Sequence, residues 1–296
     1  MNYQEFLCNM RTELSSRVTP GATLKIQTIT KNNGTHYDGL IILQPGCNIA
    51  PTIYLTPYYH RYLEGVPMKD IYDDILTTYR RYLPETDFDI GMFVDFDRAR
   101  SRIIMRLINT EYNEALLKDV PHIEYHDLSI VFYCLVYADP TNQGSILIHN
   151  SHIHMWDTSV EELHRLARQN TPALLPYKSI PMKELLKTHP LAHLLDLDEI
   201  PMQILTNKYK TNGASVILYD DLLAQISDFF AQSMILLPSS IHEWILIPVD
   251  EYNATELGYY SQVVKEVNAS QIPDDEILSE HAYFYRKETG ELISEI

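Results

Sequence analysis

The sequence predicts an α+β protein with mixed, largely antiparallel sheets, flanking helices and two lobes. Several stretches alternate apolar and polar residues, which is typical of half-buried strands. Helical stretches lie among them without the regular strand–helix spacing of a doubly wound sheet. A proline-punctuated connection at 176–201 separates an N-terminal α+β lobe at 1–175 from a C-terminal α+β lobe at 202–296 with an acidic end.

The N-terminal lobe begins with a helix expected at 2–16, where Phe6, Met10 and Leu14 recur at helical spacing. Thr23–Thr30 alternates as a strand does, and a turn at Lys31–Gly34 leads to its partner. The other strands expected here are at 37–43, 52–55, 102–108, 128–137 and 144–149, with a turn at 142–144, and helices are expected at 67–84, 89–99 and 114–118. A further helix should follow the capping box Thr158–Glu161 and end near Asn170, ahead of Pro172.

Five prolines punctuate the connection and the residues before it: Pro172, Pro176, Pro181, Pro190 and Pro201. A short helix is expected within this stretch, at 182–189. The elements expected in the C-terminal lobe are strands at 202–206, 215–219, 234–237 and 241–249, an Asn212–Gly213 turn, helices at 221–230 and 255–267, and a hairpin of 282–285 with 291–293.

Charge excludes one class of partner. The formal net charge is −17, and no stripe of Lys and Arg offsets it. Binding to nucleic acid depends largely on neutralising phosphates, so we expect no nucleic-acid partner. The same charge argues against an anionic membrane surface, and the longest apolar runs fall far short of the roughly 20 residues that span a bilayer.

The start of the chain and the cysteines both favour the cytoplasm. Residues 1–17 show no apolar run of the kind found in export signals. The three cysteines, Cys8, Cys47 and Cys134, are far apart and odd in number, which fits neither a disulfide framework nor a zinc site.

Tyrosine supplies 21 residues of the chain, and it is crowded between Tyr54 and Tyr82. Tyr carries an apolar ring and a polar tip, so such rings either edge a core or form a contact surface. We interpret them first as the edge of an amphipathic helical core. The candidate binding residues are Tyr54, Tyr58, Tyr59 and Tyr62.

Two histidine clusters resemble incomplete metal sites. His152 and His154 would share one face if their segment were extended, with His149 and Asp157 nearby. His122 and His126 flank Glu124 at a spacing that places all three on one strand face, or the two histidines on one helix face. Neither cluster contains a full ligand set, so we expect no metal. No nucleotide-binding, metalloprotease or calcium-loop motif occurs, and we expect no cofactor.

The segment Leu236–Trp244 combines hydroxyls, an imidazole and a carboxylate between two apolar strands. Ser240, His242 and Glu243 are its candidate catalytic residues. On an extended strand Ser240 and His242 point the same way, about 6.5–7 Å apart, which is long for a catalytic hydrogen bond. The alternatives are a ligand or partner site and a serine-capped turn in which these groups satisfy the backbone, and we interpret the segment first as the turn.

At this segment the chain resembles a family of bacterial proteins from anaerobic Gram-positive gut bacteria, known as domain of unknown function 5688. The resemblance spans residue 1 to about residue 286. It is carried by NIAPTIYL at 48–55, LTN at 205–207, GAS at 213–215, LPSSIHE at 237–243, EVN at 266–268 and LS at 278–279. It implies one full-length bacterial unit in the cytoplasm and brings no activity, cofactor or site residue with it.

These observations favour a non-enzymatic binding or protein-interaction module, with an unknown protein or small-molecule partner. The acidic end and the tyrosine-rich region are its expected contact surfaces. The alternative is a hydrolase-like enzyme that uses Ser240, His242 and Glu243. An enzyme would need a nucleophile and oxyanion donors in reach of His242.

Overall fold

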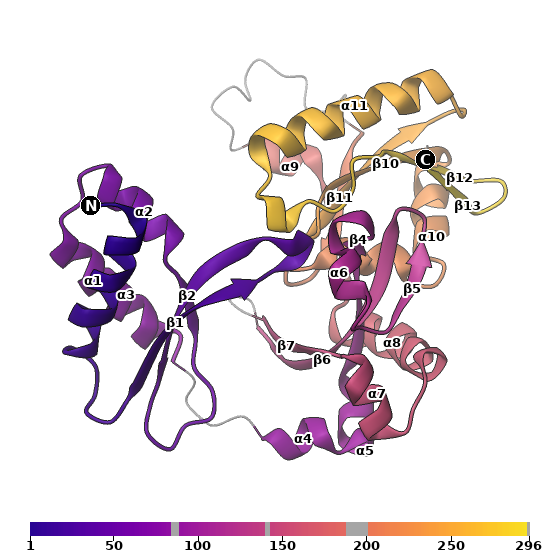
Figure 1. Ribbon diagram of the computed structural model, residues 1–296. Coiled ribbons are helices and arrows are strands. Elements are labelled where there is room, and N and C mark those ends of the chain that lie inside the picture. The colour runs from indigo at the N-terminus through magenta and orange to yellow at the C-terminus, as the bar shows by residue number, and fades with distance from the viewer. Residues whose placement is uncertain (84–88, 140–142, 188–200, 295–296) are drawn as a thin grey trace. The chain divides into compact units, whose positions relative to one another are not determined.

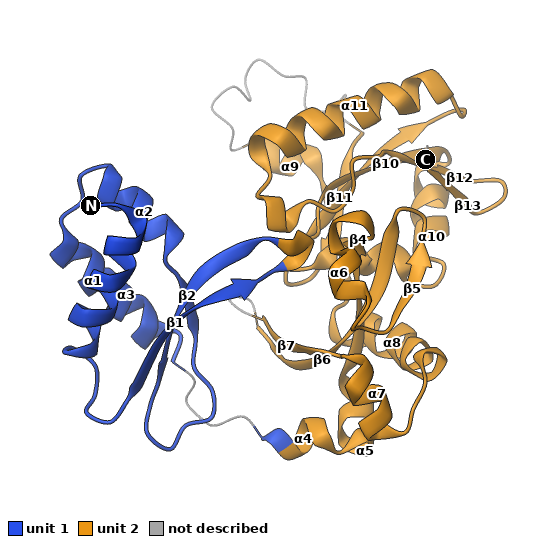
Figure 2. Ribbon diagram, viewed as in Figure 1, with its two compact units in different colours: residues 1–31, 35–90 blue, residues 32–34, 91–296 orange. Residues whose placement is uncertain are grey.

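The computed structural model describes residues 1–83, 89–139, 143–187 and 201–294, and the chain divides into two compact units (Figure 2). Unit 1 contains residues 1–31 and 35–90, and unit 2 contains residues 32–34 and 91–296. The division near residue 90 differs from the lobes expected on either side of 176–201. Strand β8 (Tyr177–Pro181), at the start of that proline-rich stretch, pairs with β9 (Gln203–Asn207) and so belongs to a sheet of unit 2.

Unit 1 is a three-stranded antiparallel sheet with helices packed on it. Its elements are α1 (Tyr3–Ser15), β1 (Thr23–Thr30), β2 (His36–Leu43), β3 (Thr52–Tyr54), α2 (Thr56–Leu63) and α3 (Met68–Arg81), with strand order β1-β2-β3 (Figure 1). Phe6, Met10 and Leu14 of α1 are fully buried against Leu40 of β2 and Ile71 of α3 in one core. The amphipathic period seen in the sequence therefore builds this unit.

Unit 2 contains two sheets. The first is built from β4 (Ile103–Asn109), β5 (His122–Tyr125), β6 (Leu128–Ala138) and β7 (Gln143–Leu147), and both β5 and β7 pair with β6. Helix α8 (Val160–Leu174) packs beside β4, where Thr171 Oγ1 accepts a hydrogen bond from Met105 N at 3.1 Å.

The second sheet has the order β13-β12-β10-β11-β9-β8. Its remaining strands are β10 (Ser233–Ser240), β11 (Glu243–Val249), β12 (Tyr283–Arg286) and β13 (Glu291–Ser294). Helix α11 (Ala254–Gln271) lies along β10 and buries Leu257 and Val264 against one face of the sheet (Figure 1). On β11 and β12, Trp244 and Tyr283 are fully buried with ring centroids 5.3 Å apart.

Unit 2 also contains shorter helices. They are α4 (Ile90–Val94), which begins at the last residue of unit 1, α5 (Phe96–Ala99), α6 (Glu114–Leu117), α7 (Asn150–Trp156), α9 (Met182–Leu186), α10 (Leu222–Phe230) and the 3₁₀ helices η1 (Asn32–Gly34), η2 (Arg100–Arg102), η3 (Glu111–Asn113), η6 (Gly213–Leu218) and η7 (Asp274–Glu276). The α+β class is confirmed, and every strand pair in the described ranges is antiparallel rather than mixed.

Three local expectations are wrong. Instead of forming a strand, residues 215–218 belong to η6 and Tyr219 follows it, because this short apolar run is mostly buried and carries no period. Residues 152–154 lie in helix α7 instead of an extended segment. Helix α8 continues past Asn170 to Leu174 with Pro172 in its last turn. Pro84, Asn142 and Pro190 lie outside the described residues.

Among the described residues, no helix has both the length and the apolar character needed to cross a membrane.

Candidate functional site

The turn between β10 and β11 contains the candidate catalytic residues. Ser240 ends β10, Glu243 begins β11, and Ile241 and His242 form the connection. The Ser240 hydroxyl accepts a hydrogen bond from His242 N at 3.1 Å, and Ile241 N donates to the Glu276 carbonyl at 2.8 Å. The serine therefore caps the backbone of the turn.

The His242 ring is held from two sides. Its Nδ1 accepts a hydrogen bond from Asn212 N at 2.9 Å, and its Nε2 lies 3.5 Å from Glu276 Oε1. Because Nδ1 is an acceptor, the neutral ring carries its proton on Nε2, facing the carboxylate. The imidazole therefore bridges the start of η6 and η7, accepting from a backbone N–H on one side and facing a carboxylate on the other.

The predicted catalytic set is thus close in space but not arranged as a triad. The hydroxyl of Ser240 is buried and bonds to a backbone N–H, while the described contacts of the His242 ring nitrogens go to Asn212 and Glu276. Glu243 is half-buried at the start of β11, and its side chain forms no hydrogen bond or ion pair with Ser240 or His242, all three of which are described. Catalysis by these residues stays a prediction.

A close-packed junction lies behind the turn. Thr206 Oγ1 donates to the His242 carbonyl at 2.7 Å, and Trp244 Nε1 donates to the Ala214 carbonyl at 2.7 Å. A Cβ added to Gly213 would lie 2.2 Å from Thr206 Oγ1 and 2.5 Å from the His242 carbonyl. Three strings that carry the family resemblance, LTN, GAS and LPSSIHE, therefore meet here, and the glycine allows them to approach.

Arg106 extends over the first sheet toward this junction, which it reaches through Gln143. It lies on β4, and its guanidinium carbon is 4.1 Å from the centre of the Tyr133 ring on β6. Beyond the ring, Nη2 donates to Ser145 Oγ at 2.8 Å and to Gln143 Oε1 at 3.1 Å on β7. The side chain therefore spans three strands.

The positive charge of Arg106 is unbalanced. It forms no ion pair with any carboxylate of the described residues, and its buried Nε has no hydrogen-bond partner. Burial lowers the pKa of this guanidinium, since removal from water penalises the charged form. A buried cation without a counter-ion is costly, and such groups mark candidate binding sites.

A chain of polar contacts joins Arg106 to the β10–β11 turn. Gln143 Oε1, which accepts from Arg106, lies 3.4 Å from Asn212 Nδ2, and the backbone N of Asn212 donates to His242. We call Arg106, Gln143, Asn212 and His242 the polar chain. It connects the first sheet to the second within unit 2.

The candidate tyrosines lie in unit 1 and mostly edge its core. Tyr58, Tyr59 and Tyr62 of α2 are half-buried against the core cluster; the Tyr59 ring is 5.2 Å from Phe6, and the Tyr58 hydroxyl donates to Thr78 Oγ1 at 3.2 Å. Tyr54 lies instead beside Tyr37, with ring centroids 5.5 Å apart. The rings of Tyr58, Tyr59 and Tyr62 thus edge a helical core, as first interpreted from the sequence. A role in binding stays a prediction.

The histidine clusters have structural partners. His149 Nδ1 contacts Asp119 Oδ2 at 2.7 Å, and His152 Nδ1 accepts from His149 N at 3.0 Å at the start of α7. Burial, with His149 as a second cause, lowers the pKa of His152. His154 follows His152 by two helical positions, so these two do not share a face.

The second cluster is also separated. His122 lies on β5, whereas His126 has a φ of +58° just after the strand and contacts Ser294 Oγ at 3.0 Å. Within the described ranges, no group of three or more His, Cys, Asp or Glu side chains is placed to hold a metal ion.

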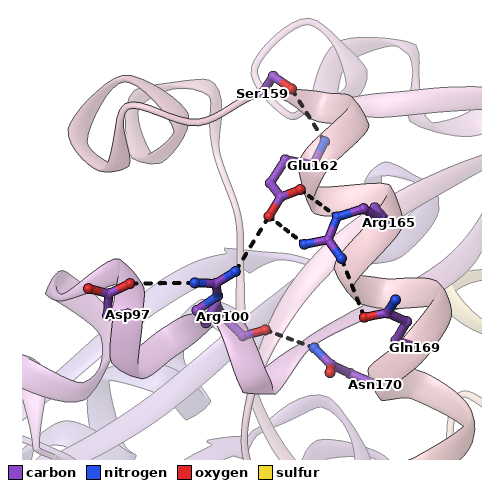
Figure 3. A network of polar contacts seen from close by, with 7 residues as sticks. All are labelled: Asp97, Arg100, Ser159, Glu162, Arg165, Gln169 and Asn170. Atoms are coloured by element: carbon purple, nitrogen blue, oxygen red, sulfur yellow. Dashed lines mark hydrogen bonds and ion pairs between the residues drawn. The ribbon is translucent and has the colours of Figure 1, made fainter.

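Helix α8 carries a different set of charges on the surface of unit 2 (Figure 3). Arg165 donates through Nε and Nη2 to the two carboxylate oxygens of Glu162, each at 2.7 Å, and Arg100 lies 3.8 Å from Glu162. Arg168 pairs with Asp220 beside a hollow of about 280 Å³. Each of these three arginines has an acidic partner.

Sequence reasoning missed Arg106, Gln143 and Asn212 as a group. One signal was present: Arg106 interrupts the apolar strand IIMRLIN, in which its neighbours on both sides are buried. The contacts with Gln143 and Asn212 join residues 37 and 69 positions apart, so no local pattern reveals them.

Comparison with known proteins identifies the family. A model described as "Family of unknown function (DUF5688)" matches residues 3–287, so the chain belongs to this family. No curated protein and no solved structure matches the chain.

Proposed function

From membership in a family of unknown function and from the geometry of unit 2, we propose that this protein is a non-enzymatic binding protein of the bacterial cytoplasm, without a nucleic-acid partner. One observation carries the proposal: Arg106 is a half-buried cation with a buried Nε that no described residue satisfies. A protein keeps such a group at a cost in stability when a partner completes it.

The β10–β11 turn supports binding over hydrolysis. The hydroxyl of Ser240 and both ring nitrogens of His242 have partners that hold the turn. A nucleophile needs its base within hydrogen-bond reach, and this pair is used otherwise.

Thermal melts of the full chain with a panel of anionic, neutral and cationic metabolites test the proposal. We expect at least one anionic compound to raise the melting temperature of the wild-type protein, because a ligand of the folded state stabilises it, and to have no such effect on Arg106→Gln. Arg165→Gln, which removes a paired surface arginine, is the matched control and should respond like the wild type.

A parallel assay tests the rival function. The protein is incubated with p-nitrophenyl acetate, and release of nitrophenol is compared among wild type, Ser240→Ala and His242→Ala. We expect equal background rates. Turnover by the wild type that both substitutions abolish would contradict the proposal and establish the hydrolase.

A further inference from the structure

We infer that Arg106 binds the carboxylate of a small organic acid with an apolar body. This inference rests on the proposed function and names its ligand class. A guanidinium has five N–H donors, and Nη2 of Arg106 uses two of them on Ser145 and Gln143. The guanidinium also contacts the Tyr133 side chain, and its Nε N–H is buried without a partner, so a carboxylate would complete this group.

The charge of the site favours a carboxylate over a phosphate. Arg106 is a single cation, and the residues it contacts among those described, Tyr133, Gln143 and Ser145, are uncharged. One guanidinium balances one carboxylate with good hydrogen-bond geometry. A phosphate carries more charge, which the net charge of −17 on the chain opposes.

The surroundings of the guanidinium favour an apolar ligand body. Tyr133, whose ring lies beneath Arg106, packs against two apolar clusters of unit 2. The partly buried Leu147 belongs to the edge of one cluster, and Tyr209 to the edge of the other. A carboxylate at Arg106 would therefore place the rest of its molecule beside apolar side chains, whose contact with the ligand adds affinity.

The polar chain gives the site its fixed geometry. Gln143 accepts from Arg106 and is contacted by Asn212, whose backbone is bonded to the His242 ring. The guanidinium is held by Gln143 and Ser145 before a ligand arrives, so little side-chain entropy is lost on binding. Gln143 and Ser145 are positioning residues in this view, and Arg106 is the binding residue.

The test is calorimetric titration of the full chain with a matched pair of probes, benzoate and benzamide, and with inorganic phosphate. We expect saturable binding of benzoate by the wild type, with benzamide and phosphate at least about tenfold weaker, equal to about 1.4 kcal/mol or more. Arg106→Gln should lose benzoate binding by a similar factor, and Arg165→Gln should retain it.

A second variant protects the test against misfolding. Arg106→Lys keeps the charge but loses the planar fork, so we expect it to fold and to bind benzoate several-fold more weakly than the wild type. Equal affinity of the wild type and both Arg106 variants for benzoate would overturn the inference.

Other outcomes separate this inference from the proposed function. Tighter binding of phosphate than of benzoate, lost in Arg106→Gln, would overturn the carboxylate class and leave a binding protein. A second outcome would also overturn the small-carboxylate ligand and leave a binding protein. In it, none of the three probes binds, and an acidic protein partner associates with the wild type but not with Arg106→Gln. Ester hydrolysis that depends on Ser240 and His242 would instead overturn the proposed function itself.

Discussion

Two regions of unit 2 use arginine in opposite ways. On the surface of α8, Arg165 and Arg168 each have a carboxylate partner and retain about half of their side-chain exposure. On the first sheet, Arg106 is half-buried and has an aromatic ring, an amide and a hydroxyl for partners. Holding the charged arginine side chain therefore costs little free energy on α8 and much more at Arg106.

The difference shows what each region does for the protein. Exposed ion pairs contribute little to stability, because water and salt already solvate their charges. Polar groups in the junction between the sheets have lost that water, so each missing partner there carries a large free-energy penalty. Substitutions in the junction should therefore change stability strongly, and substitutions on α8 should not.

The largest expected effect comes from Gly213→Ala. The new Cβ would lie 2.2 to 2.7 Å from three atoms of Thr206, Asn207 and His242, two of which belong to the backbone. Such overpacking should lower the free energy of unfolding by about 3 kcal/mol, measured by urea denaturation. If Gly213→Ala were as stable as the wild type, the junction would not be close-packed.

Gly46→Ala is the control for the Gly213 substitution. Its Cβ would meet no atom within 4 Å, but the backbone φ is +80°. It should cost only the strain of a left-handed conformation, about 1–2 kcal/mol. The difference between the two variants isolates packing from backbone strain.

An intermediate effect is expected from His242→Ala. This change leaves Asn212 N without its acceptor and removes the contact with Glu276, so it should cost about 1–3 kcal/mol and lower the melting temperature by several degrees. Ser240→Ala should be milder, because water can replace the hydroxyl at the turn. A wild-type or higher melting temperature for His242→Ala would favour a catalytic role, since active-site groups are often kept at a cost in stability.

The smallest effect is expected from Arg165→Ala on α8. Its bond to Glu162 is bidentate but exposed, and the glutamate keeps its solvent after the arginine is removed. The melting temperature should stay within the error of the measurement, and raising the salt concentration should not change that result. A fall as large as that of His242→Ala would contradict the contrast between the two regions.

Much of the fold follows from local patterns. Helix α1 and strand β1 appear where Phe6, Met10 and Leu14 and the alternating Thr23–Thr30 predict them, because each pattern matches the face that its element buries. The strand expected at 215–219 is wrong because tertiary contacts, not periodicity, determine η6: Ala214 N bonds to the Ile241 carbonyl, and the Ala214 carbonyl accepts from Trp244.

The candidate site was predictable only in part. The string LPSSIHE drew attention to His242, whose turn does form one end of the polar chain. Arg106, at the other end, is a candidate binding residue only because of its surroundings in space. The Tyr133 ring lies beneath it, and no carboxylate pairs with it in the described part of the chain. A sequence shows which charges exist but not which of them find a partner.

Asn33 in η1, between β1 and β2, sets an order for events during synthesis of the chain. Asn33 Nδ2 donates to the Ile277 carbonyl at 2.7 Å, across 244 residues, whereas Asn33 N donates to Asn113 Oδ1 at 2.9 Å, across 80. At roughly 5–20 residues per second, the ribosome completes Ile277 on the order of 10–50 s after Asn33. Closing the longer loop also costs about 1 kcal/mol more in chain entropy than the shorter one. Asn33 is therefore expected to meet Asn113 first and to be fixed to its final partners only after Ile277 has left the ribosome.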